Sequence, residues 1–327
     1  MDKSLKTDII SAEDLIYQKL LSKRFKTSYE PLYECYLGPQ PKRTDVSLLF
    51  LNVINRQDPF VLNPDDVADD APGQDAWKKI DAFFKQWRTG ESKIWQYWIN
   101  YVWMEFDNDE TPPHKAIPSL FFNTSGGTNE DIEELPDKMR AKHSLDVTTE
   151  ALRYLLHDQL SVGIENRLNK AFSDLPKGAH IGDVGIMYPR SPLQIKLIIR
   201  DMQVEETSQY MNKLGLDNDF TECIVRFCKS CSCFYDKFKL SIDIGEELIS
   251  TRVGIEFFIN EGLRFKEKWE FFLNYLVDSS LCTPDKRDAI LQFVKTGGSY
   301  ETINYVKVVF IPGKSFEAKA YLYNLSN

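Results

Sequence analysis

The chain has 327 residues, enough for one large domain or two ordinary ones, and 43% of them are apolar, which suffices for a sizeable core. Its 40 Lys and Arg residues against 49 Asp and Glu give a formal charge of −9, which argues against a general nucleic-acid-binding protein. The first residues lack the apolar segment of a secretory signal, and no apolar run reaches the roughly 18 residues of a membrane span. The sequence therefore predicts a cytoplasmic protein without a membrane span, and it leaves the oligomeric state undetermined.

The first predicted elements are a helix, a strand and a second helix. The first helix covers 10–25, where Ser11 suits an N-cap because an acidic residue follows it three positions later. The apolar run over 46–54 predicts a strand, the polar run over 55–75 predicts a loop, and 76–90 predicts the second helix.

From about residue 96 the predicted order becomes regular, with two strands followed by helices. The predicted strand pairs are 96–107 with 117–124, 182–190 with 193–201, 237–244 with 251–260, and 303–312 with 316–324. The helical stretches between the pairs are 129–173, 204–214 with 219–233, and 265–279 with 284–295. Short connections predict antiparallel pairing within each pair, and the strand near 46 is expected to complete a further pair.

No linker divides the chain, so we expect a single domain over 1–327. Residues 1–45 are expected to be an N-terminal helical segment, and 46–325 are expected to hold the repeated strand and helix pairs. The predicted fold class is α+β, with an antiparallel β-barrel or strongly curved sheet and helices packed outside it.

Successive side chains of a strand point to opposite faces, and sorting the predicted strands in this way gives one apolar and one polar face. The polar face is rich in aromatic and basic side chains. They are Tyr101, Trp103, Lys196, Arg200, Lys239, Arg252, Tyr305, Lys307, Lys319 and Tyr321. The acidic residues Glu105 and Glu256 share this face.

Two architectures fit this pattern. One is an open sheet with helices on one side and water on the other, in which each charge has a cross-strand partner. The other is a closed barrel with a polar lumen. Tyr and Trp on the polar face favour the barrel, because a solvated face does not need them. Cations gathered in such a lumen would suit a multiply charged anion such as a diphosphate.

The repeated order of two strands and two helices around an antiparallel barrel resembles the ABBA aromatic prenyltransferases. The resemblance covers roughly 46–325, and no highly specific motif accompanies it. Lys196 in IKLII, Lys307 in YVKVVF, and Lys319 with Tyr321 in AKAYLY look like the family's diphosphate-binding and cation-shielding residues. Glu105 in WMEFD is similar in placement to the glutamate that serves as a base in indole-modifying members.

The resemblance implies transfer of an isoprenoid group from an allylic diphosphate to an aromatic or peptide acceptor. The basic side chains would bind the diphosphate, and the rings of Tyr101, Trp103, Tyr305 and Tyr321 would surround the allylic cation. Glu105 would accept the proton that the acceptor loses. No cofactor is predicted, and nothing in the sequence indicates a Mg²⁺ site.

Two other functions remain open from the sequence. One is a non-enzymatic protein, such as a chaperone, that binds a peptide or ligand on the polar sheet face. The other is an open-sheet enzyme of unrelated chemistry that uses Glu105 and Asp107 with Lys196.

Four further motifs have structural interpretations that we favour over functional ones. Asp65, Asp66, Asp69 and Asp70 resemble a metal-binding run, but flanking prolines favour a solvated loop. Cys223, Cys228, Cys231 and Cys233 recur among Phe and Ile at helical spacing, which favours core packing over a metal or redox site. The four histidines are dispersed, and residues 125–128, SGGT, suit a turn.

Overall fold

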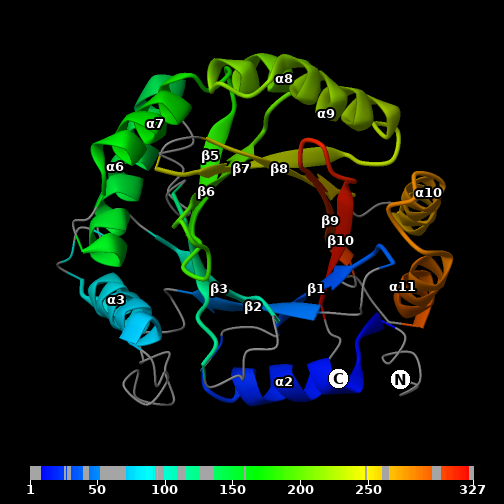
Figure 1. Ribbon diagram of the computed structural model, residues 1–327, viewed down its shortest axis with the longest axis horizontal. Coiled ribbons are helices and arrows are strands. Elements are labelled where there is room, and N and C mark those ends of the chain that lie inside the picture. Colours follow the sequence, from blue (N-terminus) through cyan, green and yellow to red (C-terminus); the bar gives the residue numbers. More distant parts are fainter. Residues whose placement is uncertain are drawn as a thin grey trace.

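Ten strands among the described residues of the computed structural model close into one antiparallel barrel, and the helices lie outside it (Figure 1). The structure describes residues 9–25, 27, 31–39, 44–51, 71–90, 92, 94, 99–108, 115–124, 136–157, 160–246, 249–259, 265–296 and 303–323. The prediction of an antiparallel barrel with external helices is therefore confirmed, and the sheet is closed rather than merely curved.

Each strand pairs with its neighbour in sequence, and the last strand pairs with the first. The strands are β1 (Leu32–Tyr36), β2 (Thr44–Leu51), β3 (Tyr101–Phe106), β4 (Ser119–Asn123), β5 (His180–Ile186), β6 (Ile195–Arg200), β7 (Lys237–Ile244), β8 (Ile249–Phe258), β9 (Ile303–Phe310) and β10 (Glu317–Leu322). Because β1 also pairs with β10, within the described residues the sheet has no free edge.

The helices follow the strand pairs around the barrel (Figure 1). They are α2 (Ala12–Ser22), α3 (Ala71–Arg88), α6 (Asp137–Leu156), α7 (Val162–Ser173), α8 (Val204–Lys213), α9 (Asn218–Ser230), α10 (Phe265–Asp278) and α11 (Pro284–Thr296). The predicted N-cap of the first helix is confirmed, because the Ser11 hydroxyl accepts a hydrogen bond from the Asp14 amide at 3.0 Å. None of the described helices is long and apolar enough to cross a membrane.

The apolar face of every barrel strand forms the core between sheet and helices. On β3, Val102, Met104 and Phe106 are fully buried, whereas the side chains that alternate with them lie on the lumen side and are partly exposed. Large aromatic side chains fill the space under α3, where the ring of Phe83 lies 5.9 Å from that of Phe122 on β4. The apolar side chains of the strand pattern therefore face the core under the helices, and the side chains between them face the lumen.

The largest difference from the predicted elements lies at the N-terminus. Leu32–Tyr36 forms β1, so the barrel begins before residue 46, within the segment that the sequence predicts to be helical. This strand has only five residues and carries a charged Glu34. Its hydrogen bonds come from β2 and from β10, nearly 300 positions away in sequence, and no local pattern reports such a partner.

Several sequence motifs fall outside the described residues, namely the aspartates at 65–70, His114 and the SGGT turn at 125–128. The cysteine motif is described. Cys228 on α9 and Cys231 just after it are buried, Cys223 is half-buried, and Cys233 is exposed. Burial raises the pKa of the Cys228 thiol to about 12, which keeps it protonated. The packing interpretation is therefore confirmed for Cys228 and Cys231.

Candidate active site

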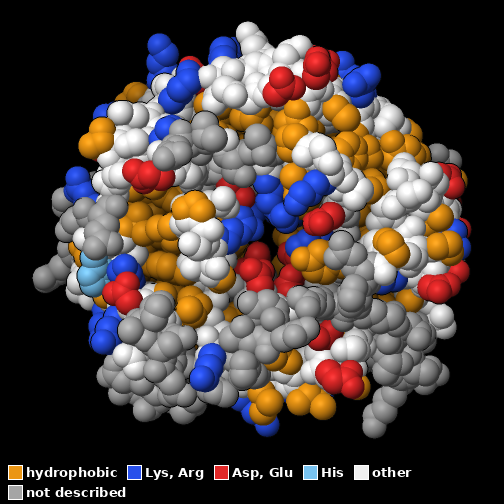
Figure 2. Space-filling view, viewed as in Figure 1, with side chains coloured by type: hydrophobic (Ala, Val, Ile, Leu, Met, Phe, Trp, Pro, Cys, Tyr) orange, Lys and Arg blue, Asp and Glu red, His pale blue; other side chains and the backbone are white. Residues whose placement is uncertain are grey.

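The barrel encloses two chambers that share Glu105 and Lys307 in their linings. The charged chamber has a volume of about 280 Å³ and is lined mostly by ionisable side chains. The aromatic chamber has a volume of about 260 Å³ and is lined by Tyr101, Trp103, Phe121 and Tyr305 among others. The space-filling view shows the hollow inside the ring of strands, with basic side chains on one side and acidic side chains on the other (Figure 2).

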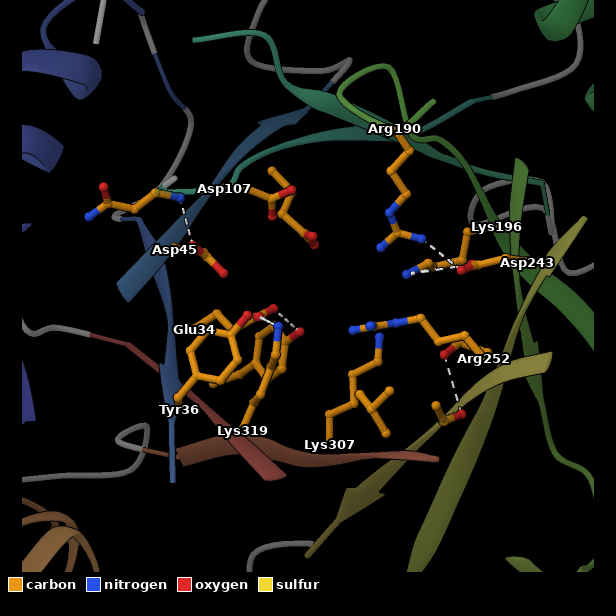
Figure 3. A pocket seen from close by; sticks show the side chains of 16 residues that line it. Glu34, Tyr36, Asp45, Asp107, Arg190, Lys196, Asp243, Arg252, Lys307 and Lys319 are labelled. Carbon is orange, nitrogen blue, oxygen red and sulfur yellow. Dashed lines mark hydrogen bonds and ion pairs between the residues drawn. The ribbon is translucent and has the colours of Figure 1, made fainter. Parts of the chain in front are cut away.

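One side of the charged chamber is basic. We define this basic wall as Arg190, Lys196 and Arg252, which come from the turn after β5, from β6 and from β8 (Figure 3). Two of these cations share one carboxylate, because Asp243 lies 2.7 Å from Arg190 Nη1 and 3.6 Å from Lys196 Nζ. Burial, together with the nearby Lys307 and Arg190 charges, lowers the pKa of Lys196 to about 8 despite Asp243. Arg190 and Lys196 therefore share the negative charge of one carboxylate, which makes this wall suited to an anion.

The opposite side of the charged chamber is acidic, and one of its carboxylates is fully satisfied. Glu34 on β1 receives hydrogen bonds from the Lys319 ammonium and the Tyr321 hydroxyl. Burial alone would raise the pKa of Glu34, but the Lys319 charge holds it at about 2. The Lys319 ammonium also lies 4.1 Å from the centre of the Tyr36 ring. The Lys319 ammonium therefore already has two partners, the Glu34 carboxylate and the Tyr36 ring.

Three further carboxylates line this side, and we define them as the acidic wall: Asp45, Glu105 and Asp107. Burial and the neighbouring Glu34 charge raise the pKa of Asp45 to about 9 and that of Glu105 to about 7, and they also raise the pKa of Asp107. Burial and a neighbouring carboxylate both favour the protonated form of a carboxyl group. The acidic wall is therefore the counterpart of the basic wall, with the opposite imbalance.

Aromatic rings dominate the second chamber. The ring of Tyr305 stacks on that of Tyr321 with centroids 4.1 Å apart, and it lies 5.0 Å from the ring of Phe258. Burial raises the pKa of both tyrosines well above the ordinary value, so both are neutral. Their π faces can stabilise a positive charge without forming a bond to it.

The charges of the aromatic chamber are mostly paired. Arg200 Nη2 donates to Asp183 at 2.6 Å and to the Tyr101 hydroxyl at 2.7 Å, and that hydroxyl donates to Asp183 at 2.6 Å. Lys307 lies 3.2 Å from Glu256. The Lys239 ammonium lies 4.4 Å from the centre of the Phe258 ring. The first three residues form a closed triangle of hydrogen bonds.

Two glycines on the lumen face make room for the side chains of their neighbours. A Cβ on Gly185 would lie 2.3 Å from the ring of Phe121, its cross-strand partner, and one on Gly254 would lie 2.7 Å from Lys307 Cε. Glycine at these positions lets a ring enter the aromatic chamber and a lysine reach the wall between the chambers.

Every residue predicted for the site lies on the lumen, but the predicted residues are distributed over the two chambers. Lys196, Arg252, Lys319 and Tyr321 line the charged chamber, whereas Tyr101, Trp103, Arg200, Lys239 and Tyr305 line the aromatic chamber. Glu105 and Lys307 line both. The six predicted cations therefore do not form a single cluster, although the prediction of a shared lumen is correct.

The charged lumen residues that were not predicted for the site include Glu34, Asp45, Asp183 and Arg190. Glu34 lies on the strand that the sequence did not reveal, and Asp45 lies directly before the apolar run predicted over 46–54. Asp183 alternates with Val184 and Ile186 on β5, but a bulge between Ile181 and Asp183 interrupts the alternation before it, which weakens the sequence signal. Arg190 lies in a turn, where alternation gives no information.

Among the described residues, no group of three or more His, Cys, Asp and Glu side chains has an arrangement that could hold a metal ion. His143, His157 and His180 lie on α6, just after α6 and at the start of β5, respectively. His180 lies 3.3 Å from Asp201 outside both chambers. These three described histidines therefore line neither chamber.

Comparisons with known proteins connect this geometry to a fold. No protein-family model and no curated protein sequence matches the chain. The chain matches the crystal structure of 5-dimethylallyltryptophan synthase from Streptomyces coelicolor with a TM-score of 0.51 and 9% identity, covering 99% of this chain and 95% of that one. The chain therefore has the ABBA prenyltransferase fold.

Other solved structures of this fold give the same result. AnaPT from Neosartorya fischeri matches with a TM-score of 0.55 and 12% identity, covering 90% of this chain and 78% of that one. The prenyltransferase PriB, in a ternary complex with L-tryptophan and dimethylallyl thiolodiphosphate, matches with a TM-score of 0.54 and 8% identity, covering 98% and 93%. At these identities the similarity establishes the fold and leaves the reaction to be inferred from the site.

Proposed function

We propose that the protein transfers an isoprenoid group from an allylic diphosphate to an aromatic or peptide acceptor. The observation that carries this proposal is the sharing of Glu105 and Lys307 between the two chambers. An anion on the basic wall would place its attached carbon chain towards rings that can shield a cation. The solved complex of PriB with a diphosphate analogue and an aromatic amino acid supports the same class of reaction.

In the proposed reaction, the basic wall and Lys307 bind the diphosphate. The bond between the allylic carbon and the diphosphate oxygen breaks, and its electron pair leaves with the diphosphate, whose added charge the cations stabilise. The faces of Trp103, Tyr305 and Tyr321 surround the allylic cation and exclude water. The acceptor then forms a bond to the allylic carbon, and its proton passes to Glu105.

Lys239 and Arg200 have a different place in this proposal from the diphosphate-binding role that the sequence suggests. Both line the aromatic chamber, where Arg200 is paired with Asp183 and Lys239 lies over Phe258. We assign them to the aromatic end of the substrate pair, where Arg200 fixes the Tyr101 hydroxyl and Lys239 fixes the Phe258 ring.

Thermal melting with dimethylallyl, geranyl and farnesyl diphosphates tests the proposal. Pyrophosphate and the corresponding alcohols serve as controls, because saturable binding to the folded state raises the melting temperature. We expect one allylic diphosphate to raise it more than pyrophosphate does, and an Arg252→Met, Lys196→Met double variant to lose the increase. Mass spectrometry of an aromatic acceptor incubated with that donor should then show the added isoprenoid mass.

The pairing of lumen cations favours a second candidate, a non-enzymatic ligand-binding protein. Lys319, Lys307 and Lys196 already have carboxylate partners, so a bound ligand would need to compete with them or to be neutral overall. A melting temperature that no allylic diphosphate changes, together with no product mass, would contradict the transferase proposal and favour this candidate.

A further inference from the structure

The acidic wall contains carboxylates that the proposed transfer of an isoprenoid group does not use. Asp45 lies on β2, and Glu105 and Asp107 lie at the end of β3 and just after it. All three line the charged chamber, and the view into that chamber places Asp45 and Asp107 across from Arg190 and Lys196 (Figure 3). A diphosphate bound to the basic wall would leave these carboxylates on the opposite side of the chamber, without a contact of opposite charge.

Within the described part of the chain, the acidic wall has few partners. Asp45 is 4% exposed and accepts one hydrogen bond, from the Asn108 amide to Oδ1 at 2.7 Å. The side chains of Glu105 and Asp107 form no hydrogen bond or ion pair with any described residue. The Lys319 ammonium, whose charge acts on Asp45 and Asp107, is hydrogen-bonded to Glu34.

A buried hydroxyl beside Glu105 adds an independent observation. Ser119 on β4 is the cross-strand partner of Glu105 and is on the same face of the strand as Phe121, which lines the lumen. It is fully buried, and its Oγ has no hydrogen-bond partner among the described residues. Buried polar atoms are almost always hydrogen-bonded in folded proteins, so a polar group that is not among the described residues would satisfy this hydroxyl.

The ionisation of the wall agrees with a missing positive charge. Asp45 has a pKa raised to about 9, and the groups that face it are Glu34, Lys319, Asp107 and the Asn108 amide. Glu105 has a pKa raised to about 7, facing Glu34, Asp107, Lys196 and Lys307. A bound cation would lower both pKa values, because an opposite charge favours the ionised carboxylate.

We propose that the acidic wall binds a positively charged nitrogen group of the acceptor, an ammonium or a guanidinium, while the basic wall binds the anionic leaving group. The binding of a leaving group by the basic wall rests on the proposed transfer reaction. The cation site rests only on the geometry of the charged chamber. Separate walls for the two charges place the acceptor beside Glu105, between the diphosphate and the rings. They also select against uncharged aromatic acceptors, which would leave Asp45 and Asp107 without a partner.

Matched small probes test the cation site directly. Benzylamine and benzylguanidine carry the two cationic groups on one aromatic ring, and benzyl alcohol is their uncharged counterpart. At pH 7.5 we expect both cationic probes to raise the melting temperature and to bind on the order of tenfold more tightly than benzyl alcohol, since charge-assisted hydrogen bonds are the stronger class. The relative effect of the amine and the guanidine identifies the group that the site prefers.

Two variants and one control locate the effect. Asp45→Asn with Asp107→Asn should abolish the preference for the cationic probes, and Asp107→Asn alone provides a milder change at a partly exposed position that does not threaten folding. Asp278→Asn, an exposed residue at the end of α10, makes the same chemical change away from the lumen and should leave the preference intact.

The outcomes separate this inference from the proposed function. Equal binding of benzylamine and benzyl alcohol, or a preference that survives in both lumen variants, would overturn the cation site, even if allylic diphosphates still bind. A preference that disappears in the lumen variants supports the site, even if no allylic diphosphate binds and the transfer proposal fails. Binding of pyrophosphate, measured on the same proteins, reports the basic wall separately.

Discussion

The two chambers of the lumen are formed by the same barrel with the same alternation of side chains, but their charged groups are arranged differently. In the aromatic chamber, Arg200, Asp183 and the Tyr101 hydroxyl close on one another. In the charged chamber, the basic wall and the acidic wall stay on opposite sides, and Lys196 and Glu105 have pKa values shifted towards neutrality. A chamber whose charges are mutually satisfied holds its shape, whereas one with separated walls is prepared for a ligand that has charges of its own.

Glu105, one of the two residues that line both chambers, should give the largest effect. Glu105→Gln removes the proposed base and keeps the size of the side chain, so we expect transfer to slow by about 10²- to 10⁴-fold with donor binding retained. Because burial raises the pKa of Glu105 to about 7, the wild-type rate should rise with pH through about 7 and then level off, as the carboxylate is the active form. A rate profile that stays flat between pH 5 and 8, or full activity in Glu105→Gln, would remove Glu105 from the mechanism.

The next largest effect concerns the Lys319–Glu34 pair of the charged chamber. Lys319→Met leaves Glu34 buried without its cation, and such a loss costs about 3 to 5 kcal/mol of unfolding free energy. Lys319 holds the pKa of Glu34 at about 2, below its unfolded value, so this stabilisation is present above about pH 5 and is lost as the pH falls towards 2. Chemical denaturation at pH 7 and pH 3 should therefore show a smaller difference between variant and wild type at pH 3.

A surface pair provides the control for that experiment. Lys170 and Asp174 form an ion pair at 2.6 Å on α7, with the lysine side chain 51% exposed. Lys170→Met should change the unfolding free energy by no more than about 0.5 kcal/mol. Similar losses for the two lysine variants would show that burial does not strengthen the Glu34 pair.

In the aromatic chamber, Asp183→Asn should break the triangle that Arg200 and Tyr101 complete. Arg200 would keep one hydrogen bond to the Tyr101 hydroxyl and lose its charged partner, which we expect to cost about 2 to 3 kcal/mol. Since the side chain of Arg200 is 28% exposed, water offsets part of the loss. A loss as large as that of Lys319→Met would contradict this distinction between the two pairs.

The two lumen glycines sharpen the comparison further. Gly185→Ala places a methyl group against the Phe121 ring, which has packed neighbours, and we expect a cost of about 1 to 3 kcal/mol. Gly254→Ala meets the flexible end of Lys307 and the Ser241 hydroxyl, so it should cost less and should instead move the Lys307 ammonium. Unfolding free energies of the two variants decide the order, and weaker pyrophosphate binding in Gly254→Ala would report the displaced lysine.

The smallest effect, and the only expected gain, comes from the acidic wall. The pKa of Asp45 is about 9 in the folded protein and about 4 in an unfolded chain, so the folded state binds the proton more tightly and loses stability as the pH rises between these values. Asp45→Asn does not titrate. Its melting temperature relative to wild type should therefore be higher at pH 8 than at pH 5, by a few degrees. A constant difference across this range would show that Asp45 does not face uncompensated charge.

Much of the fold could be predicted from alternation and spacing. Strands such as Lys237–Ile244 show the apolar and polar faces directly, because Phe, Leu and Ile alternate along this strand with Lys, Ser and Asp. β1 could not be predicted, since five residues with a central Glu34 carry too little local signal and their partners are distant in sequence. For the site, parity placed the predicted residues on the lumen but could not assign them to one chamber or the other.

The sequence by itself determined which face of each strand is polar, because the spacing of two residues is a property of the extended chain. It thereby determined that Lys196, Lys307, Lys319 and Glu105 share a surface. Only the tertiary structure decided that the sheet closes and that the Lys319 ammonium pairs with Glu34. It also decided that Asp45 and Asp107 lie across the chamber from Arg190 and Lys196. Those outcomes depend on strand register and closure between residues hundreds of positions apart, and electrostatic energies in a lumen follow distances in space rather than order along the chain.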